Sequence, residues 1–212
     1  MKRLSFVLIV AGGLVCCSAS KANITGISFA DDGDGAITCP VYTWSGSASD
    51  LSAPITGEQC WEPAHVVGTI TTDTANDPNL ILGSAIDNDT TFAWTAYQVN
   101  VYMNNTFSLS AASVTLPADW TLASIQTTAV PVVSLHGSYE AQILFTSGTP
   151  VAIGDELDFS YKISFSGATS YSFTQEMIPV PEPGTLGFLM AGVLLLSGKK
   201  IVQRRHNHSS KH

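Results

Sequence analysis

The sequence has few basic residues, and nearly all of them lie close to its two ends. Of nine Lys and Arg residues, only Lys162 lies between Asn23 and Pro183, whereas all seventeen Asp and Glu residues lie in that stretch, which gives it a net charge of −16. Nucleic acids and anionic membranes are bound largely through cationic contacts. The composition therefore disfavours nucleic acid and anionic membranes as partners of this acidic region, and we expect no nucleic acid partner; it favours solubility, divalent cations or basic partners.

Motifs with catalytic spacing are also absent. The sequence has no HExxH, GxSxG or CxxC pattern and no glycine-rich phosphate loop. The acidic region contains two histidines, His65 and His136, and both are expected in loops. We therefore expect no enzyme and no cofactor. One alternative stays open, because Glu58, Glu62 and Glu140 could converge as the paired carboxylates of a glycoside hydrolase.

Between Asn23 and Met177 the sequence lacks any long amphipathic helix and any internal repeat, and hydrophobic residues recur with a period of two. This period is typical of strands with one buried and one solvent-exposed face. It is clearest for Leu157, Phe159, Tyr161, Ile163 and Phe165, and it recurs over residues 97–103, 139–145 and 171–173. Further strands are expected at 24–30, 66–72, 80–86, 106–116 and 122–128.

Short turn signals separate these segments, so we predict an all-β fold: an antiparallel β-sandwich domain over residues 23–178. Phe92 and Trp94 have the opposite phase to Tyr97, Val99 and Val101. A β-bulge or a change of face at residues 95–96 would bring both groups to the same core.

Cysteine is scarce, with four residues in the chain, of which only Cys39 and Cys60 lie in the acidic region. In an exported protein such a pair predicts a disulfide. Closing a loop of about 22 residues would stabilise the fold by about 3 kcal/mol in the chain-entropy model. Two free thiols are the alternative.

The N-terminus has the three parts of a secretory signal peptide, which we assign to residues 1–22. Lys2 and Arg3 precede an apolar stretch over residues 4–15, and small residues follow. Cleavage is expected after Ala22 or Ala19, with the Sec translocon and signal peptidase as partners. Lipidation of Cys16 or Cys17 is a minor alternative, because the residue before the modified cysteine should be small.

The C-terminus, residues 179–212, has three successive features. A rigid Pro181-Glu182-Pro183 tripeptide precedes an uncharged apolar run, and the basic residues Lys199, Lys200, Arg204 and Arg205 follow. A helix over residues 184–202 has about 19 residues, which is just enough to cross a bilayer if the lysines extend to the interface. The basic cluster is expected to stop transfer and stay cytoplasmic.

This order resembles the PEP-CTERM protein-sorting signal of Gram-negative bacteria. The resemblance covers roughly the last 35 residues and implies an exosortase, a membrane-embedded cysteine transpeptidase-like enzyme, as partner. It also implies an inner-membrane anchor before cleavage near Pro181-Glu182-Pro183, and then transfer to the cell surface or extracellular matrix. The tail from His206 to His212 is longer and richer in histidine than expected.

Two kinds of ligand site are suggested for the exported domain. Asp31, Asp32 and Asp34 lie with two glycines in one predicted loop, and closely spaced carboxylates of this kind suit Ca²⁺, although they are also ordinary turn residues. The loop at residues 87–89 is a weaker calcium candidate. Trp44 and Trp61, expected in loops, could stack on the sugars of an extracellular polysaccharide; anchoring the core is the alternative role for tryptophan.

Overall fold

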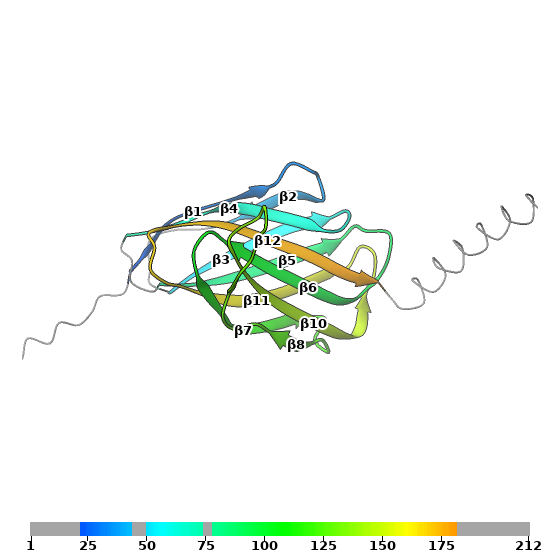
Figure 1. Ribbon diagram of the computed structural model, residues 1–212. Helices are drawn as coiled ribbons and strands as arrows, with labels where there is room; N and C mark the ends of the chain where they lie inside the picture. The colour runs from blue at the N-terminus through cyan, green and yellow to red at the C-terminus, as the bar shows by residue number, and fades with distance from the viewer. Residues whose placement is uncertain (1–21, 44–49, 74–77, 182–212) are drawn as a thin grey trace, which may run out of the picture.

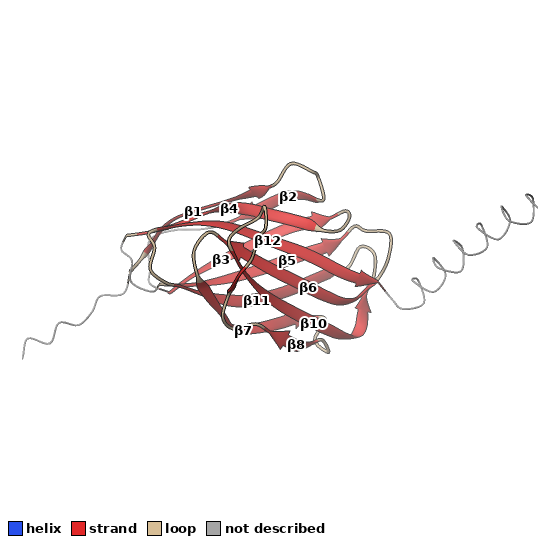
Figure 2. Cartoon of the chain, viewed as in Figure 1, coloured by secondary structure: helices blue, strands red, loops and turns tan. Residues whose placement is uncertain are grey.

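A computed structural model describes residues 22–43, 50–73 and 78–181 of the protein. These residues form twelve β-strands in two packed sheets (Figures 1 and 2). The part of the chain that is described contains no helix with the length and apolar character needed to span a membrane. The predicted signal peptide, except Ala22, and the predicted helix at 184–202 lie outside the described residues.

Sheet A has seven strands and sheet B has five. The order in sheet A is β1 (Ile24–Asp31), β4 (Ala64–Thr72), β12 (Ser170–Pro181), β6 (Trp94–Met103), β10 (Tyr139–Val151) and β8 (Thr121–Ile125), with β9 (Val130–Pro131) also pairing with β10. The order in sheet B is β2 (Ile37–Tyr42), β3 (Asp50–Gln59), β5 (Asn79–Asn88), β11 (Glu156–Phe165) and β7 (Phe107–Leu116). The predicted β-sandwich is thus confirmed.

The prediction that every strand pair is antiparallel is wrong at one place, because β3 and β5 are parallel neighbours. The strand between them in sequence, β4, belongs to the other sheet. The chain therefore leaves sheet B after β3, reverses along sheet A and reverses again to return beside β3 in the same direction. Parallel neighbours need a crossover of this kind.

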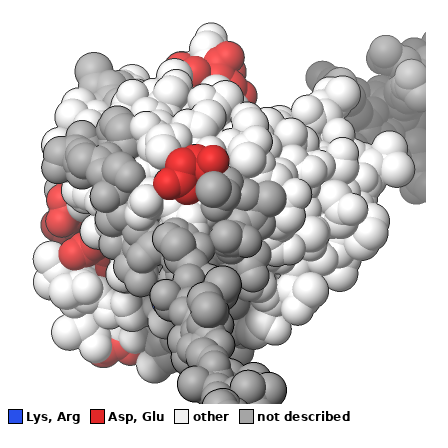
Figure 3. All heavy atoms as spheres, turned by 90° about the vertical axis from the view of Figure 1, so that its left-hand side faces the viewer, with Lys and Arg blue, Asp and Glu red and all other residues white. Residues whose placement is uncertain are grey.

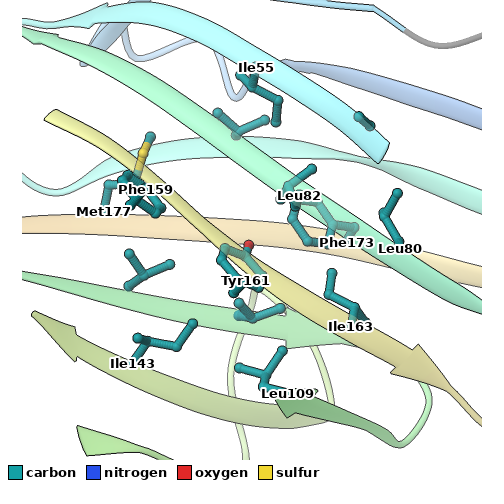
Figure 4. Close-up of a cluster of buried hydrophobic side chains, with 14 of the residues drawn as sticks. Ile55, Leu80, Leu82, Leu109, Ile143, Phe159, Tyr161, Ile163, Phe173 and Met177 are labelled. Carbon is teal, nitrogen blue, oxygen red and sulfur yellow. The ribbon is translucent and has the colours of Figure 1, made fainter. Parts of the chain in front are cut away.

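The core lies between the two sheets and follows the predicted alternation. Phe159, Tyr161 and Ile163 of β11 are fully buried, and in Figure 4 they lie with Ile143 and Phe173 from sheet A. In β6, β10 and β12 every second side chain likewise faces the core. Consequently the alternate residues of sheet A point away from the core, onto its outer face.

The bulge predicted near residues 95–96 is present. Trp94 and Ala96 oppose Pro181 and Val180 of β12, so Thr95 is an extra residue on β6 without a register partner. The bulge lets Trp94 and Tyr97 both reach the core, where both are fully buried with ring centroids 5.1 Å apart.

Strand β12 extends the sandwich to Pro181, beyond the predicted boundary at residue 178. Its pairing with β4 ends at Met177, whereas its pairing with β6 continues to Pro181. Beyond Met177 the strand therefore has one paired edge only, and Pro179 and Pro181, which have no N–H, are tolerated there. The first residue of the predicted sorting motif, Pro181, is thus part of the folded domain.

Cys60 is a free thiol, so the predicted disulfide to Cys39 is not formed in this structure. The strand register gives the reason. The backbone N–H of Cys60 donates to the carbonyl oxygen of Ala36, and Ile37 pairs with Gln59. Cys39 therefore lies three positions further along β2, roughly 10 Å away at about 3.3 Å per residue, and a disulfide requires Cα atoms within about 7 Å. The side chain of Cys39 lies outside the described residues.

Candidate functional site

A row of polar side chains crosses the outer face of sheet A. In the strand register His65 of β4 pairs with Glu176 of β12, Glu176 pairs with Asn100 of β6, and Asn100 pairs with Gln142 of β10. In its own strand each of these residues stands next to residues that face the core, and successive side chains of a strand point to opposite faces. All four side chains therefore lie on the outer face of sheet A. The register alone therefore brings an imidazole, a carboxylate and two amides together from four strands.

His65 is the most buried ionisable member of this row, with 7% of its surface exposed. Its Nδ1 lies 3.2 Å from Oδ2 of Asp32, and its Nε2 lies 3.5 Å from Oε1 of Glu176. Both contacts are within ion-pair distance, but neither has hydrogen-bond geometry, so both buried ring nitrogens are without a hydrogen bond among the described residues. Buried polar side-chain atoms in proteins nearly always have a hydrogen-bond partner, so the two ring nitrogens of His65 need an explanation.

Glu176 is held from its other side. Nδ2 of Asn100 donates to Oε2 of Glu176 at 2.7 Å, and the hydroxyl of Tyr102 donates to the same oxygen at 3.0 Å. Burial of Tyr102 and the nearby carboxylate of Glu176 raise the pKa of the hydroxyl well above its ordinary value, so Tyr102 remains a donor at neutral pH. The oxygen Oε1 is left to face His65.

His136 comes from the segment between β9 and β10, which folds over this face of sheet A. Its ring stacks on that of His65, with centroids 4.6 Å apart and an interplanar angle of 18°. Gly137 permits this approach, since a Cβ there would lie 2.8 Å from the backbone nitrogen and oxygen of Met103. The N–H of Ser138 donates to the carbonyl of Met103, which ties the segment to β6.

Two sets of three residues have possible ligand atoms within 4.8 Å of one another. One set is His65, His136 and Glu176, and the other is Asp32, Asp34 and His65. The two sets share one imidazole, and both offer nitrogen as well as oxygen donors. The arrangement is therefore chemically suited to holding a cation.

The acidic loop has a structural role that is visible in its hydrogen bonds. Oδ1 of Asp32 accepts from the N–H of Asp34, and Oδ1 of Asp34 accepts from the N–H of Ala36. Gly33 and Gly35 have φ values of 99° and 74°, which favour glycine. Asp31 is in neither set of possible ligands, and its buried Oδ1 has no hydrogen bond among the described residues. The calcium site at Asp31, Asp32 and Asp34 stays a prediction.

The second acidic loop is a turn with internal hydrogen bonds. Asn88 is fully buried, and its Nδ2 donates to the carbonyls of Phe92 and Val151 at 3.0 Å. Its Oδ1 accepts from the backbone N–H and the hydroxyl of Thr90. These contacts use the amide group of Asn88 to close the turn.

The tryptophans divide between core and surface. Trp94 and Trp120 are buried, Trp61 has 52% of its surface exposed, and Trp44 lies outside the described residues. An open groove of about 180 Å³ on sheet B is lined by other residues, including Glu58, Asp87 and Glu156. The structure therefore leaves Trp61 available at the surface but does not place it in this groove.

Sequence reasoning missed the site because it expected His65 in a loop, whereas His65 lies in β4. Its position between the buried residues Ala64 and Val66 was the available signal for an outward-facing strand residue. Two of the three glutamates considered as a catalytic set lie on different sheets: Glu140 accepts a hydrogen bond from Tyr102 on sheet A, and Glu58 is on sheet B. Of the predicted sorting motif only Pro181 is described. The other predicted motif and stop-transfer residues lie outside the described residues: Glu182, Pro183, Lys199, Lys200, Arg204 and Arg205.

Comparisons with protein families, curated proteins and solved structures found no match.

Proposed function

We propose that this protein is an exported cell-surface or extracellular-matrix protein with a structural or interaction role. The Sec translocon exports it, signal peptidase removes residues 1–22, and the helix at 184–202 holds it in the inner membrane. An exosortase then cleaves it near Pro181-Glu182-Pro183. The observation that carries this proposal is the order of motif, apolar run and basic cluster at the C-terminus.

The end of the folded domain is compatible with such processing. The sandwich ends at Pro181, whose register partner is Trp94. Cleavage after this residue would leave every described strand in the released product. The distribution of charge also fits export, because Lys162 is the one basic residue among the described residues. Figure 3 accordingly displays acidic patches and no basic side chain on the face in view.

Fractionation with mass spectrometry of the mature C-terminus tests the proposal. In a host with an active exosortase we expect wild-type protein to lose the tail, whereas Glu182→Ala and Pro183→Ala should keep it and stay in the membrane fraction. Both substitutions follow the last residue of β12 and so leave the described strands unchanged. A matched host without the exosortase serves as control. A mature wild-type population ending at His212 would overturn the processing claim.

A second function, binding of extracellular carbohydrate, is favoured by one observation: more than half of the surface of Trp61 is exposed. Exposed aromatic rings are suited to contacts in which one side of the ring is buried by a ligand. Retardation of the protein in gels containing bacterial polysaccharide, compared with Trp61→Ala, checks this. Equal mobility of the two proteins would remove the carbohydrate hypothesis.

A further inference from the structure

We propose that His65, His136 and Glu176 form a binding site for a divalent transition-metal ion of the Zn²⁺ type. This proposal is independent of the sorting signal, because it rests on the outer face of sheet A alone. The three residues come from β4, from the segment before β10, and from β12. Their possible ligand atoms lie within 4.8 Å of one another.

The donor set selects the class of metal. Two imidazole nitrogens and one carboxylate oxygen suit Zn²⁺ and neighbouring transition metals, whereas Ca²⁺ and Mg²⁺ prefer sites made of oxygen. Ligand atoms about 2.1 Å from a tetrahedral ion are roughly 3.4 Å apart. The most distant of the three donors would therefore need to approach one another by up to about 1.4 Å, which side-chain rotation of His136, in its loop, can supply.

The groups around His65 resemble those that orient a metal-binding histidine. Oδ2 of Asp32 lies 3.2 Å from Nδ1, so a small rotation of the carboxylate would let it accept a hydrogen bond from Nδ1–H. That tautomer directs the lone pair of Nε2 toward Glu176, which is 3.5 Å away. Carboxylates commonly hold the second ring nitrogen of a metal-bound histidine in this way. Both nitrogens of His65 would then have a partner, which resolves the missing hydrogen bonds of this buried ring.

Glu176 is oriented in the same manner. Asn100 and Tyr102 both donate to Oε2, so this oxygen is occupied and Oε1 is directed toward the imidazoles. His136 lies close enough to share an ion with His65, because the two ring centroids are 4.6 Å apart. Rotation of the His136 side chain would bring one of its nitrogens toward the same ion.

The alternative is that His65 binds no metal and only contacts Asp32 and Glu176. Zinc titration of the full chain, purified in detergent, distinguishes the two. His206, His208 and His212 must first be replaced by alanine, because histidines are potential zinc ligands wherever they are exposed. In this background we expect one zinc per chain by equilibrium dialysis, and a visible Co²⁺ spectrum typical of nitrogen and oxygen ligands.

Variants then locate the ion. His136→Ala and Glu176→Gln should each weaken zinc binding about tenfold or more, and Asp32→Asn about tenfold, as is usual for groups around a metal. Asp34→Asn is the matched control, because Asp34 belongs only to the other set, and its affinity should equal that of the parent protein. A circular-dichroism melt of each metal-free variant confirms folding, and His136→Ala keeps the test valid if Glu176→Gln unfolds.

Three results would overturn the proposal. The first is the absence of bound zinc in the background without tail histidines. The second is unchanged affinity in His136→Ala. The third is loss of binding in Asp34→Asn with retention in His136→Ala, which would place the ion at the acidic loop instead. Displacement of zinc by an equal concentration of Ca²⁺ would likewise contradict the choice of metal.

Discussion

The two outer faces of the sandwich differ in what covers them. On sheet A the outward residues Asn100, Tyr102 and Thr174 are each at most 8% exposed, because the segment before β10 lies over them. On sheet B the outward residues Ser113 and Ser160 form an exposed hydrogen bond at 3.0 Å. A polar residue can thus face away from the core and still be buried. Buried polar groups with specific partners are where binding chemistry concentrates, which directs attention to sheet A.

The largest expected effect contrasts the two sides of sheet B. Phe159→Ala should lower the free energy of unfolding by about 3–5 kcal/mol, because it leaves a cavity between the sheets. Ser160→Ala, one residue further along β11 on the open face, should change it by less than about 0.5 kcal/mol. Urea denaturation measures both. Similar losses for the two variants would mean that the outer face of sheet B is not open.

High pH should lower the free energy of unfolding through ionisation of three tyrosines. Tyr97 and Tyr161 lie in the core between the sheets, and Tyr102 lies on the outer face of sheet A. Burial raises the pKa values of Tyr97 and Tyr161 well above 10, and burial with the carboxylate of Glu176 raises that of Tyr102. Because the folded-state pKa values are raised, their stabilisation is complete below about pH 10, the unfolded value. Above it, each tyrosine should lower the free energy of unfolding by up to about 1.4 kcal/mol per pH unit.

Denaturation curves from pH 8 to 11 check this expectation. Above pH 10 the free energy of unfolding of Tyr102→Phe should fall less steeply with pH than that of the wild type, because one ionising tyrosine is absent. A slope unchanged in this variant would contradict the burial of Tyr102 under the covering segment.

A substitution at Gly137 should displace the segment between β9 and β10 that covers the outer face of sheet A. Gly137→Ala should lower the free energy of unfolding by about 1–3 kcal/mol, because the added Cβ overlaps the backbone of Met103. Gly83→Ala is the matched control on the outer face of sheet B, where the nearest atom to a new Cβ is Cα of Pro54 at 3.9 Å. Thermal melts of the two variants compare the two faces directly. Equal melting temperatures would contradict the close packing of Gly137 against Met103.

The smallest expected effect concerns a single hydrogen bond. Tyr102→Phe removes the donor to Oε2 of Glu176 and should cost about 1 kcal/mol at pH 7. Tyr139→Phe, on neighbouring β10, should cost less, since the hydroxyl of Tyr139 has no hydrogen bond within residues 22–43, 50–73 and 78–181. Urea denaturation at pH 7 resolves the difference, and a loss in Tyr139→Phe as large as that in Tyr102→Phe would contradict it.

Much of the fold was predictable, because the period of two in β6, β10, β11 and β12 is a local property of each strand. The strands β2 and β3 and the two-residue strand β9 were missed. In β3 the buried residues Leu51, Ala53 and Ile55 do alternate, but small residues and Pro54 weaken the pattern. The parallel β3–β5 pair was not predictable either, because sheet membership depends on which hydrophobic faces pack together and not on local periodicity.

By itself the sequence determined the faces of the strands, the acidic character of the domain and the order of features that resembles a sorting signal. These depend on residue type and spacing along one stretch of chain. Only the tertiary structure decided that Pro181 belongs to the sandwich and that His65, Glu176 and His136 meet. Their meeting requires a register between strands distant in sequence and a close backbone approach at Gly137, and both are set by packing of the whole domain.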